Sequence, residues 1–302
     1  MHPQPLIEIG SFRIYPYGVC MAVGILACFG FLLYTMWKNK FNEDASDKIL
    51  FIGLFGTGFG IFSAMLFQAT YNYIANPSRG FVLGDSMTFI GGLIGGVVSF
   101  LGVYWLYIYV IAPRTKVKML QNNMNATLTD ALPFIPIGIA IAHSFGRLGC
   151  FFGGCCYGLE TDAWFGLYCA KNYNPTTGAV YMGSKVIPTQ LFECIFLALL
   201  AIIMIILYFK FKFNYNFGVY AVSYGIWRFI IEYFRADARG VLIPGVPLYP
   251  SQIWSIVMVL LGIGYFFLQH YVLSKYMKHP ELKDSVKKPQ KSDDGDKAGV
   301  TE

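Results

Sequence analysis

A run of charged and aromatic residues in the last third of the chain has the spacing of one helical face. Tyr224, Arg228, Glu232, Arg235 and Arg239 follow one another at steps of three or four residues. Side chains at such steps lie on the same side of a helix. Because the segment from Arg228 to Arg239 would rise roughly 16 Å, we expect a charged ridge that descends into an apolar helix, with Arg228 and Glu232 at its deep end.

The arginine at position 228 is the member of this ridge that most needs an explanation. An arginine deep in lipid costs at least ~2.5 kcal/mol, and such residues usually face an internal cavity. A guanidinium has a planar fork of donors that matches phosphate oxygens, so a phospholipid headgroup is its expected partner. Plainer roles stay open. Arg228 and Glu232 could only join helices, while Arg235 and Arg239 could be anchors at the water interface.

A second segment with candidate functional residues runs from His143 to Gly158. It holds five glycines within sixteen residues, too many for a stable helix that faces lipid, and irregular backbone at membrane depth must be buried in protein or face water. We therefore expect a re-entrant or loop segment beside a polar cavity. Arg147 would point into that cavity as a second guanidinium, complementary to Arg228.

Four of the seven cysteines, at positions 150, 155, 156 and 169, fall in or near this segment. Three interpretations stay open. They are small buried packing residues, or Cys169 takes part in a disulfide in an outer loop, or the cluster is a metal or redox site. The spacing is not a CxxC pair and His143 is the only nearby histidine, so no metal ligand and no cofactor is predicted.

These segments must be positioned by membrane helices. More than half of the residues are hydrophobic, only 13% are charged, and the mean hydropathy is +0.51, which excludes an ordinary soluble domain. A bilayer core needs about 20 apolar residues per helix. The fold class expected is an all-α membrane protein with seven transmembrane helices, at residues 15–37, 49–75, 89–112, 128–146, 187–209, 217–234 and 249–273.

The basic residues set the expected orientation. Most of the 23 Lys and Arg residues fall between alternate helices and in the polar tail, and the side that carries them is cytoplasmic by the positive-inside rule. The amino terminus is then outside. Residues 1–275 form the membrane domain, and residues 276–302 are expected to be a disordered cytoplasmic tail. The net charge of +6 reflects orientation and contact with anionic lipid, and no nucleic-acid partner is expected.

Several motifs resemble those of the bacterial prolipoprotein diacylglyceryl transferases. GRLGCFFGGCCYG at 146–158 is similar to the signature loop of that family, in a form that contains cysteines. YGIWRFIIEYFRADARG at 224–240 resembles its Tyr-Gly-x-x-Arg-Phe-x-x-Glu-x-x-Arg segment. Shorter likenesses complete the pattern in the family's order, at Tyr17-Gly18, 89–95, 187–193 and 250–255.

The resemblance implies an enzyme in the plasma membrane of bacteria, with its active site toward the outer leaflet. It would act as a monomer on phosphatidylglycerol, joining the diacylglyceryl group to the cysteine thiol in the lipobox of a preprolipoprotein signal peptide and releasing glycerol phosphate. Arg147 and Arg228 would bind the headgroup, and His143 and Tyr17 are the other candidate catalytic residues. The expected substrate-binding residues are Gly158, Cys150, Cys155, Glu232, Arg235, Tyr224, Gln190 and Glu193.

The chain departs from the family pattern where a base could sit. Ile90 and Ile187 stand where the family usually has histidine, and Cys150 and Cys155 replace an asparagine and a glutamate. A thiol must become a thiolate to attack carbon, so a general base is useful. His143 could take that role, although a lone histidine at a helix end is more often a packing residue.

Two rival functions follow from these departures. A catalytically silent relative would bind a phospholipid or lipopeptide without turnover, as the missing histidines favour. A membrane thiol oxidoreductase would use Cys150, Cys155 and Cys156, although no quinone or haem motif is present. The retained arginines and the glycine-rich loop favour the transferase.

Overall fold

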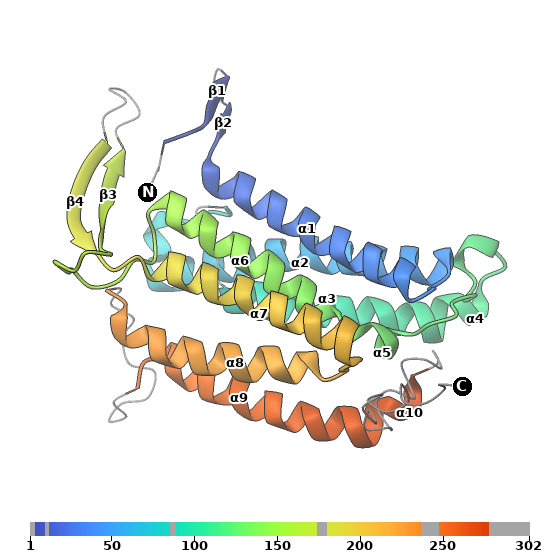
Figure 1. Cartoon of the computed structure of the whole chain (residues 1–302). Coiled ribbons are helices and arrows are strands. Elements are labelled where there is room, and N and C mark those ends of the chain that lie inside the picture. The colour runs from blue at the N-terminus through green and yellow to red at the C-terminus, as the bar shows by residue number, and fades with distance from the viewer. Residues whose placement is uncertain (1–3, 10–11, 85–88, 174–179, 237–247, 278–302) are drawn as a thin grey trace, which may run out of the picture. The chain divides into compact units, whose positions relative to one another are not determined.

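Long apolar helices make up most of the computed structural model (Figure 1). It describes residues 4–9, 12–84, 89–173, 180–236 and 248–277. The chain divides into two compact units, residues 1–35 with 129–302, and residues 36–128. Most of the tail expected from residue 276 onward lies outside the described residues, as does Arg239.

The first unit is a bundle of long helices with short elements at their ends. The long helices are α1 (Pro16–Lys38), which continues into the second unit, α6 (Ile135–Gly153), α7 (Thr189–Phe211), α8 (Asn216–Ile231) and α9 (Pro250–Leu268). The short elements are β1 (Ile7–Ile9), β2 (Phe12–Ile14), α5 (Leu128–Ala131), β3 (Leu167–Tyr173), β4 (Val180–Val186), η4 (Glu232–Phe234), η5 (Gln269–Leu273) and α10 (Ser274–Tyr276). β1 pairs with β2 and β3 with β4, both antiparallel.

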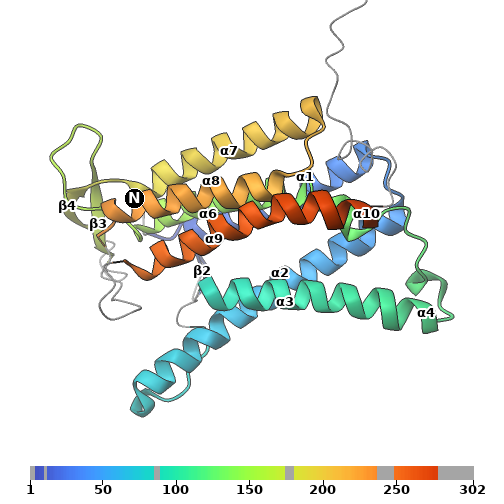
Figure 2. The same ribbon diagram turned by 90° about the horizontal axis from the view of Figure 1, so that it is seen from below.

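Glycines let these helices approach closely. A Cβ added at Gly24 of α1 would lie 2.7 Å from Cβ of Phe145 in α6, and one at Gly262 of α9 would lie 2.9 Å from Cβ of Ala221 in α8. Small residues at contact points are how membrane helices gain van der Waals packing, since lipid offers no hydrophobic drive for association. In Figure 2, α8 and α9 run side by side along their length.

The candidate site residues lie at one end of this bundle. Tyr17 near the start of α1 packs against Gly149 near the end of α6. Gln190 in the first turn of α7 donates to the carbonyl of Cys155, just after α6. The amino ends of α1 and α7 therefore meet the carboxyl end of α6, beside β3 and β4 (Figure 1).

The second unit is built on an antiparallel pair of helices, α2 (Glu43–Ala75) and α3 (Phe89–Leu106) (Figure 2). Gly60 of α2 faces Gly92 and Gly96 of α3, and a Cβ at Gly60 would lie 3.1 Å from the Gly92 carbonyl oxygen. The Ser63 hydroxyl donates to the Gly91 carbonyl at 2.9 Å. Its remaining short elements are η1 (Pro77–Arg79), η2 (Tyr107–Ile111), α4 (Ala112–Arg114) and η3 (Lys118–Leu120).

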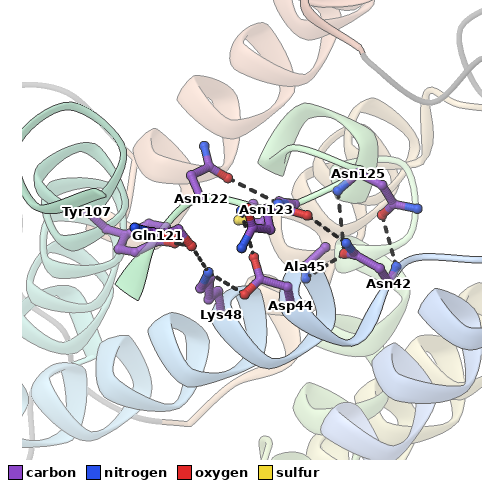
Figure 3. Close-up of polar contacts among 10 residues, drawn as sticks. Asn42, Asp44, Ala45, Lys48, Tyr107, Gln121, Asn122, Asn123 and Asn125 are labelled. Carbon is purple, nitrogen blue, oxygen red and sulfur yellow. Dashed lines mark hydrogen bonds and ion pairs between the residues drawn. The ribbon is translucent and has the colours of Figure 1, made fainter. Parts of the chain in front are cut away.

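A polar network fixes the loop at 121–125 to the start of α2 (Figure 3). The Asn42 side chain caps α2 by accepting from the Ala45 N–H at 2.9 Å, and it donates to the Asn123 carbonyl at 2.7 Å. Lys48 bonds both the Asp44 carboxylate and the Gln121 carbonyl. The carbonyls of Gln121 and Asn123 in this loop thus find partners in α2 and its cap without a helix or sheet of their own.

The expectation of an all-α membrane protein is confirmed. Among the described residues, six helices are long and apolar enough to span a membrane: Pro16–Lys38, Glu43–Ile74, Gly91–Arg114, Ile135–Gly153, Thr189–Phe211 and Pro250–Tyr276. The window expected at 217–234 corresponds to α8, which has only 16 residues. The count of seven spans and the orientation therefore stay predictions.

Two expected boundaries were wrong. The helix expected at 128–146 begins at Ile135, because Pro136 occupies its first turn, where proline is tolerated. It then runs to Gly153, so most of the glycine-rich segment is helical. Its glycines are accommodated because Gly149 faces Tyr17 of α1 and not lipid. The loop begins only at Gly154.

The charged ridge was also expected to be longer than it is. The α-helix ends at Ile231, Glu232 opens the 3-10 turn η4, and Arg235 has extended backbone. Arg228 and Glu232 still lie on one face, whereas Arg235 approaches the site from a bridge with Gly158.

Candidate active site

A buried carboxylate, Glu193 of α7, links the helices that carry the two arginines. Its Oε1 lies 3.1 Å from Nη2 of Arg147 and accepts a hydrogen bond of 2.8 Å from the Tyr224 hydroxyl. Arg147 also donates to that hydroxyl at 3.3 Å. Glu193 is 0% exposed and Arg147 17%, so α6, α7 and α8 share one charged contact shielded from solvent.

Arg228 extends the same cluster. Its Nη2 lies 2.8 Å from the Glu232 carboxylate, one turn further along, and its side chain is 11% exposed. Arg228 also interacts electrostatically with Glu193 and Tyr224. Arg147 thus contacts Glu193 directly, whereas Arg228 contacts Glu232, and the convergence of the two arginines on one ligand stays a prediction.

Each of the two guanidinium groups has a buried donor that no protein group satisfies. Nε of Arg147 and Nη1 of Arg228 are buried and have no hydrogen-bond partner. A buried donor without a partner is costly, and such donors are rare in folded proteins. With Arg235 the cluster carries three guanidinium groups against the two carboxylates of Glu193 and Glu232. This arrangement suits an anion with several oxygens.

His143 lies one turn before Arg147 on α6. Its Nδ1 is 3.0 Å from the Tyr220 hydroxyl, and its ring meets that of Tyr224 edge-on at 4.7 Å. Its orientation is therefore set by two tyrosines of α8. Tyr220 was not singled out from the sequence, although it lies one turn before Tyr224 on the same helical face and could have been included by that spacing.

The cysteines lie beside the arginines. Gly154 ends α6 with φ +69°, and the Cys155 N–H then donates back to the Cys150 carbonyl at 3.2 Å. The Cys156 backbone has φ +63°, a left-handed conformation uncommon for residues other than glycine. The sulfurs of Cys150, Cys155 and Cys156 lie within 4.8 Å of one another.

Two polar residues at the start of α7 hold the backbone of Cys155 and Cys156 in place. The Gln190 amide donates to the Cys155 carbonyl at 2.6 Å, and the Thr189 hydroxyl donates to the Cys156 carbonyl at 2.9 Å. Gln190 was expected to bind substrate, and in the structure its amide supports the cysteine turn. Thr189 was not singled out from the sequence.

The environment of Cys156 favours its thiolate. Hydrogen bonds from the Cys150 and Cys155 thiols, together with the positive charge of Arg235, lower the pKa of Cys156 below its ordinary value. None of the seven cysteines, all within the described residues, forms a disulfide. Cys169 is buried, 1% exposed, near the Gly154 carbonyl.

Gly158 lies where three backbone segments meet. Its N–H donates to the Ile187 carbonyl at 2.9 Å, the Leu159 N–H donates to the Phe234 carbonyl at 2.9 Å, and Gly158 bridges Arg235. A Cβ at this position would lie 2.5 Å from the Phe234 carbonyl oxygen and 2.8 Å from the Thr189 methyl. Gly158 therefore contributes by its lack of a side chain, which lets Arg235 approach the cysteines.

Replacing Gly158 by alanine is expected to lower both the thermal midpoint in detergent and any activity of this site, because Phe234 and Arg235 must move outward. Gly264→Ala is the matched control, since a Cβ there meets nothing within 4 Å and the change should be neutral or slightly stabilising. Equal midpoints and activities for both variants would contradict the close approach at Gly158.

The structure brings the expected site residues of this unit to one end of the bundle, where Tyr17 packs against Gly149. Comparison with known proteins then gives a family. The prolipoprotein diacylglyceryl transferase family model matches residues 4–268. The chain belongs to this family. As a member of the diacylglyceryl transferase family it is a multi-pass membrane protein, in agreement with its apolar helices.

Relatives named phosphatidylglycerol–prolipoprotein diacylglyceryl transferase match this family member over most of their length. The protein from Clostridium tetani is 29% identical over 268 residues, which cover 88% of this chain and 97% of the relative. The one from Hydrogenovibrio crunogenus is 30% identical over 268 residues, covering 85% and 91%. One from Dehalococcoides mccartyi is 29% identical over 265 residues, covering 86% and 90%.

Proposed function

We propose that the chain transfers the diacylglyceryl group of phosphatidylglycerol to a cysteine thiol of prolipoproteins. The names of its relatives state this activity. The observation that carries this is a pair of shielded guanidinium groups, Arg147 against Glu193 and Arg228 against Glu232, each with a buried donor that has no hydrogen-bond partner. Such a pair fits one phosphate group.

The reaction needs the glyceryl carbon to exchange oxygen for sulfur. The thiol sulfur attacks that carbon, the C–O bond to the phosphate breaks, and glycerol phosphate leaves with the bonding electron pair. Negative charge therefore grows on the phosphate oxygens as the bond breaks. Donors fixed at that position before the reaction stabilise the charge without reorganising, and Nε of Arg147 and Nη1 of Arg228, which have no partner in the protein, would serve as these donors.

Glu193 and Glu232 keep the arginines in place without neutralising them fully. Each carboxylate contacts one arginine at 2.8–3.1 Å, and together they offset the repulsion between two buried guanidinium groups. The residual positive charge is available to the phosphate. His143 is a candidate proton acceptor only through Nε2, because Nδ1 faces Tyr220.

The site is proposed to face the outer leaflet of the bacterial plasma membrane. The end of the bundle that holds Arg147 is opposite the end where α7 turns into α8 with Lys210 and Lys212. Basic residues mark the cytoplasmic side. Phosphatidylglycerol and the signal peptides of preprolipoproteins would then both reach the site from outside the cytoplasm.

A reporter that fluoresces only in the cytoplasm, fused after Lys275, is expected to give signal, because the basic tail should lie inside. The control is the same reporter fused near the amino terminus, which should be dark. A dark carboxyl-terminal fusion in a stable protein would reverse the orientation, and with it the leaflet assigned to the site.

The function is tested in cells depleted of their own transferase. Expression of the chain is expected to restore lipoprotein maturation, and the purified protein should transfer label from phosphatidylglycerol to a lipobox peptide. Arg13→Lys, at an exposed residue paired with Glu8, is the matched control for substitutions at Arg147 and Arg228. Binding of phosphatidylglycerol without transfer would identify a catalytically silent relative.

A further inference from the structure

Three thiols meet at the end of α6, although their spacing in the sequence does not indicate a metal site. Cys150 belongs to the last turn of the helix, and Cys155 and Cys156 follow the left-handed Gly154. The backward turn, the positive φ of Cys156 and the Gln190 and Thr189 hydrogen bonds return both later cysteines to Cys150. This convergence depends on α7 and could not be read from α6 alone.

The distances among the sulfurs suit a shared metal ion. All three lie within 4.8 Å of one another. In a tetrahedral site with zinc–sulfur bonds of about 2.3 Å, two sulfurs lie about 3.8 Å apart. Rotation of the cysteine side chains by a small amount covers the difference. Three thiolates select a soft ion such as Zn²⁺ and exclude Mg²⁺ or Ca²⁺, which take oxygen ligands.

The charges around the three cysteines also suit a bound zinc ion. The positive charge of Arg235 acts on Cys156, and Arg147 interacts electrostatically with Cys150 from one turn earlier. A divalent ion with three thiolates carries one net negative charge. A guanidinium on each side of the cluster offsets that charge in surroundings of low polarity.

Within the described residues, the group of metal-ligating side chains contains three members and no fourth. Cys155 is exposed, so the cluster is reachable from outside the protein. Sites with three protein ligands and one exchangeable position are typical of catalytic zinc, whereas structural zinc has four protein ligands.

We propose that Cys150, Cys155 and Cys156 bind one Zn²⁺ ion whose fourth ligand is the thiol of the incoming peptide. The proposal rests on the proposed function, which supplies that thiol. Coordination to the ion removes the thiol proton to water. The bound sulfur then attacks the glyceryl carbon, and glycerol phosphate leaves toward Arg147 and Arg228.

This role accounts for a departure from the family pattern. Ile187 replaces a histidine of that pattern, and its backbone pairs with Gly158, Leu159 and Thr189. A side chain without a titratable group cannot accept a proton. A zinc ion bound to the replacing cysteines lowers the thiol's pKa and makes a protein base unnecessary.

The test begins with metal content and not with activity. The full chain, purified in detergent and exchanged against Zn²⁺, is expected to retain about one ion per protein by elemental analysis. Cys155→Ser and Cys156→Ser should each lose most of it. Cys194→Ser is the matched control, because its sulfur faces Ser144 of α6 outside the cluster, and it should retain the ion.

Substitution of Co²⁺ for Zn²⁺ tests by absorption spectroscopy whether the peptide thiol is the fourth ligand. With Co²⁺ in place of Zn²⁺, the protein should show sulfur-to-cobalt absorption that increases on adding a lipobox peptide with cysteine and does not change with the serine peptide. These readouts need no turnover, so an inactive protein that binds the metal contradicts only the proposed function. Absence of stoichiometric Zn²⁺ in the reduced protein, or full transfer activity in both cysteine variants, would overturn the zinc proposal.

Discussion

Arg228→Lys is expected to lose nearly as much transfer activity as Arg228→Ala. A lysine keeps one positive charge, but its donors all sit on one nitrogen, so it lacks the planar fork whose separate nitrogens can contact a phosphate and Glu232 together. In the structure, Nη2 is committed to Glu232 while Nη1 has no partner. Removing one preorganised donor from a reacting anion costs about 10²–10³ in kcat, and we expect a loss of that order for both variants.

The measurement is the rate of transfer to a lipobox peptide at saturating phosphatidylglycerol, together with the thermal midpoint. Arg13→Lys should retain its activity, because the Arg13 side chain is 39% exposed and paired only with Glu8. If Arg228→Lys were nearly as active as the unchanged protein, the site would need only a point charge, and the separate roles of Nη1 and Nη2 would be wrong.

The helices could be predicted from the sequence because lipid imposes a simple rule of length and apolarity. The windows for α1, α2, α3, α7 and α9 coincide with observed helices to within several residues. The residues at which α6 begins and ends could not be predicted. Its start depends on Pro136, and its end depends on the fit of Gly149 against α1. Glycine in a helix is tolerated where a neighbouring helix covers it, and one sequence does not show which helix that is.

The candidate site was predicted in part. Periodicity placed Arg228 and Glu232 on one face, and their ion pair confirms that contact. Glu193 followed only from the resemblance, because nothing near it in the sequence indicates that α7 delivers a carboxylate to Arg147. The same limit applies to the cysteines, whose convergence requires Gln190 and Thr189 from another helix. Contacts between distant segments were missed wherever no periodic pattern joined them.

Glu193→Gln is expected to destabilise the protein as well as inactivate it. Glu193 is fully buried and contacts Arg147 and Tyr224. Removing its charge leaves the Arg147 guanidinium without its counter-ion, and breaking a buried pair in this way typically costs about 3–5 kcal/mol. The midpoint of thermal unfolding in detergent measures the loss, and transfer activity should fall with it because Arg147 is no longer held in place.

Two comparisons separate the charge from the packing. Glu8→Gln makes the same chemical change in an exposed pair, where a loss of only about 0–1 kcal/mol is expected. Combining Glu193→Gln with Arg147→Gln should destabilise less than the sum of the two single changes, since the double variant buries no uncompensated charge. Additive effects would mean that Arg147 and Glu193 are not coupled, and the arginine would then need another counter-ion in the cavity.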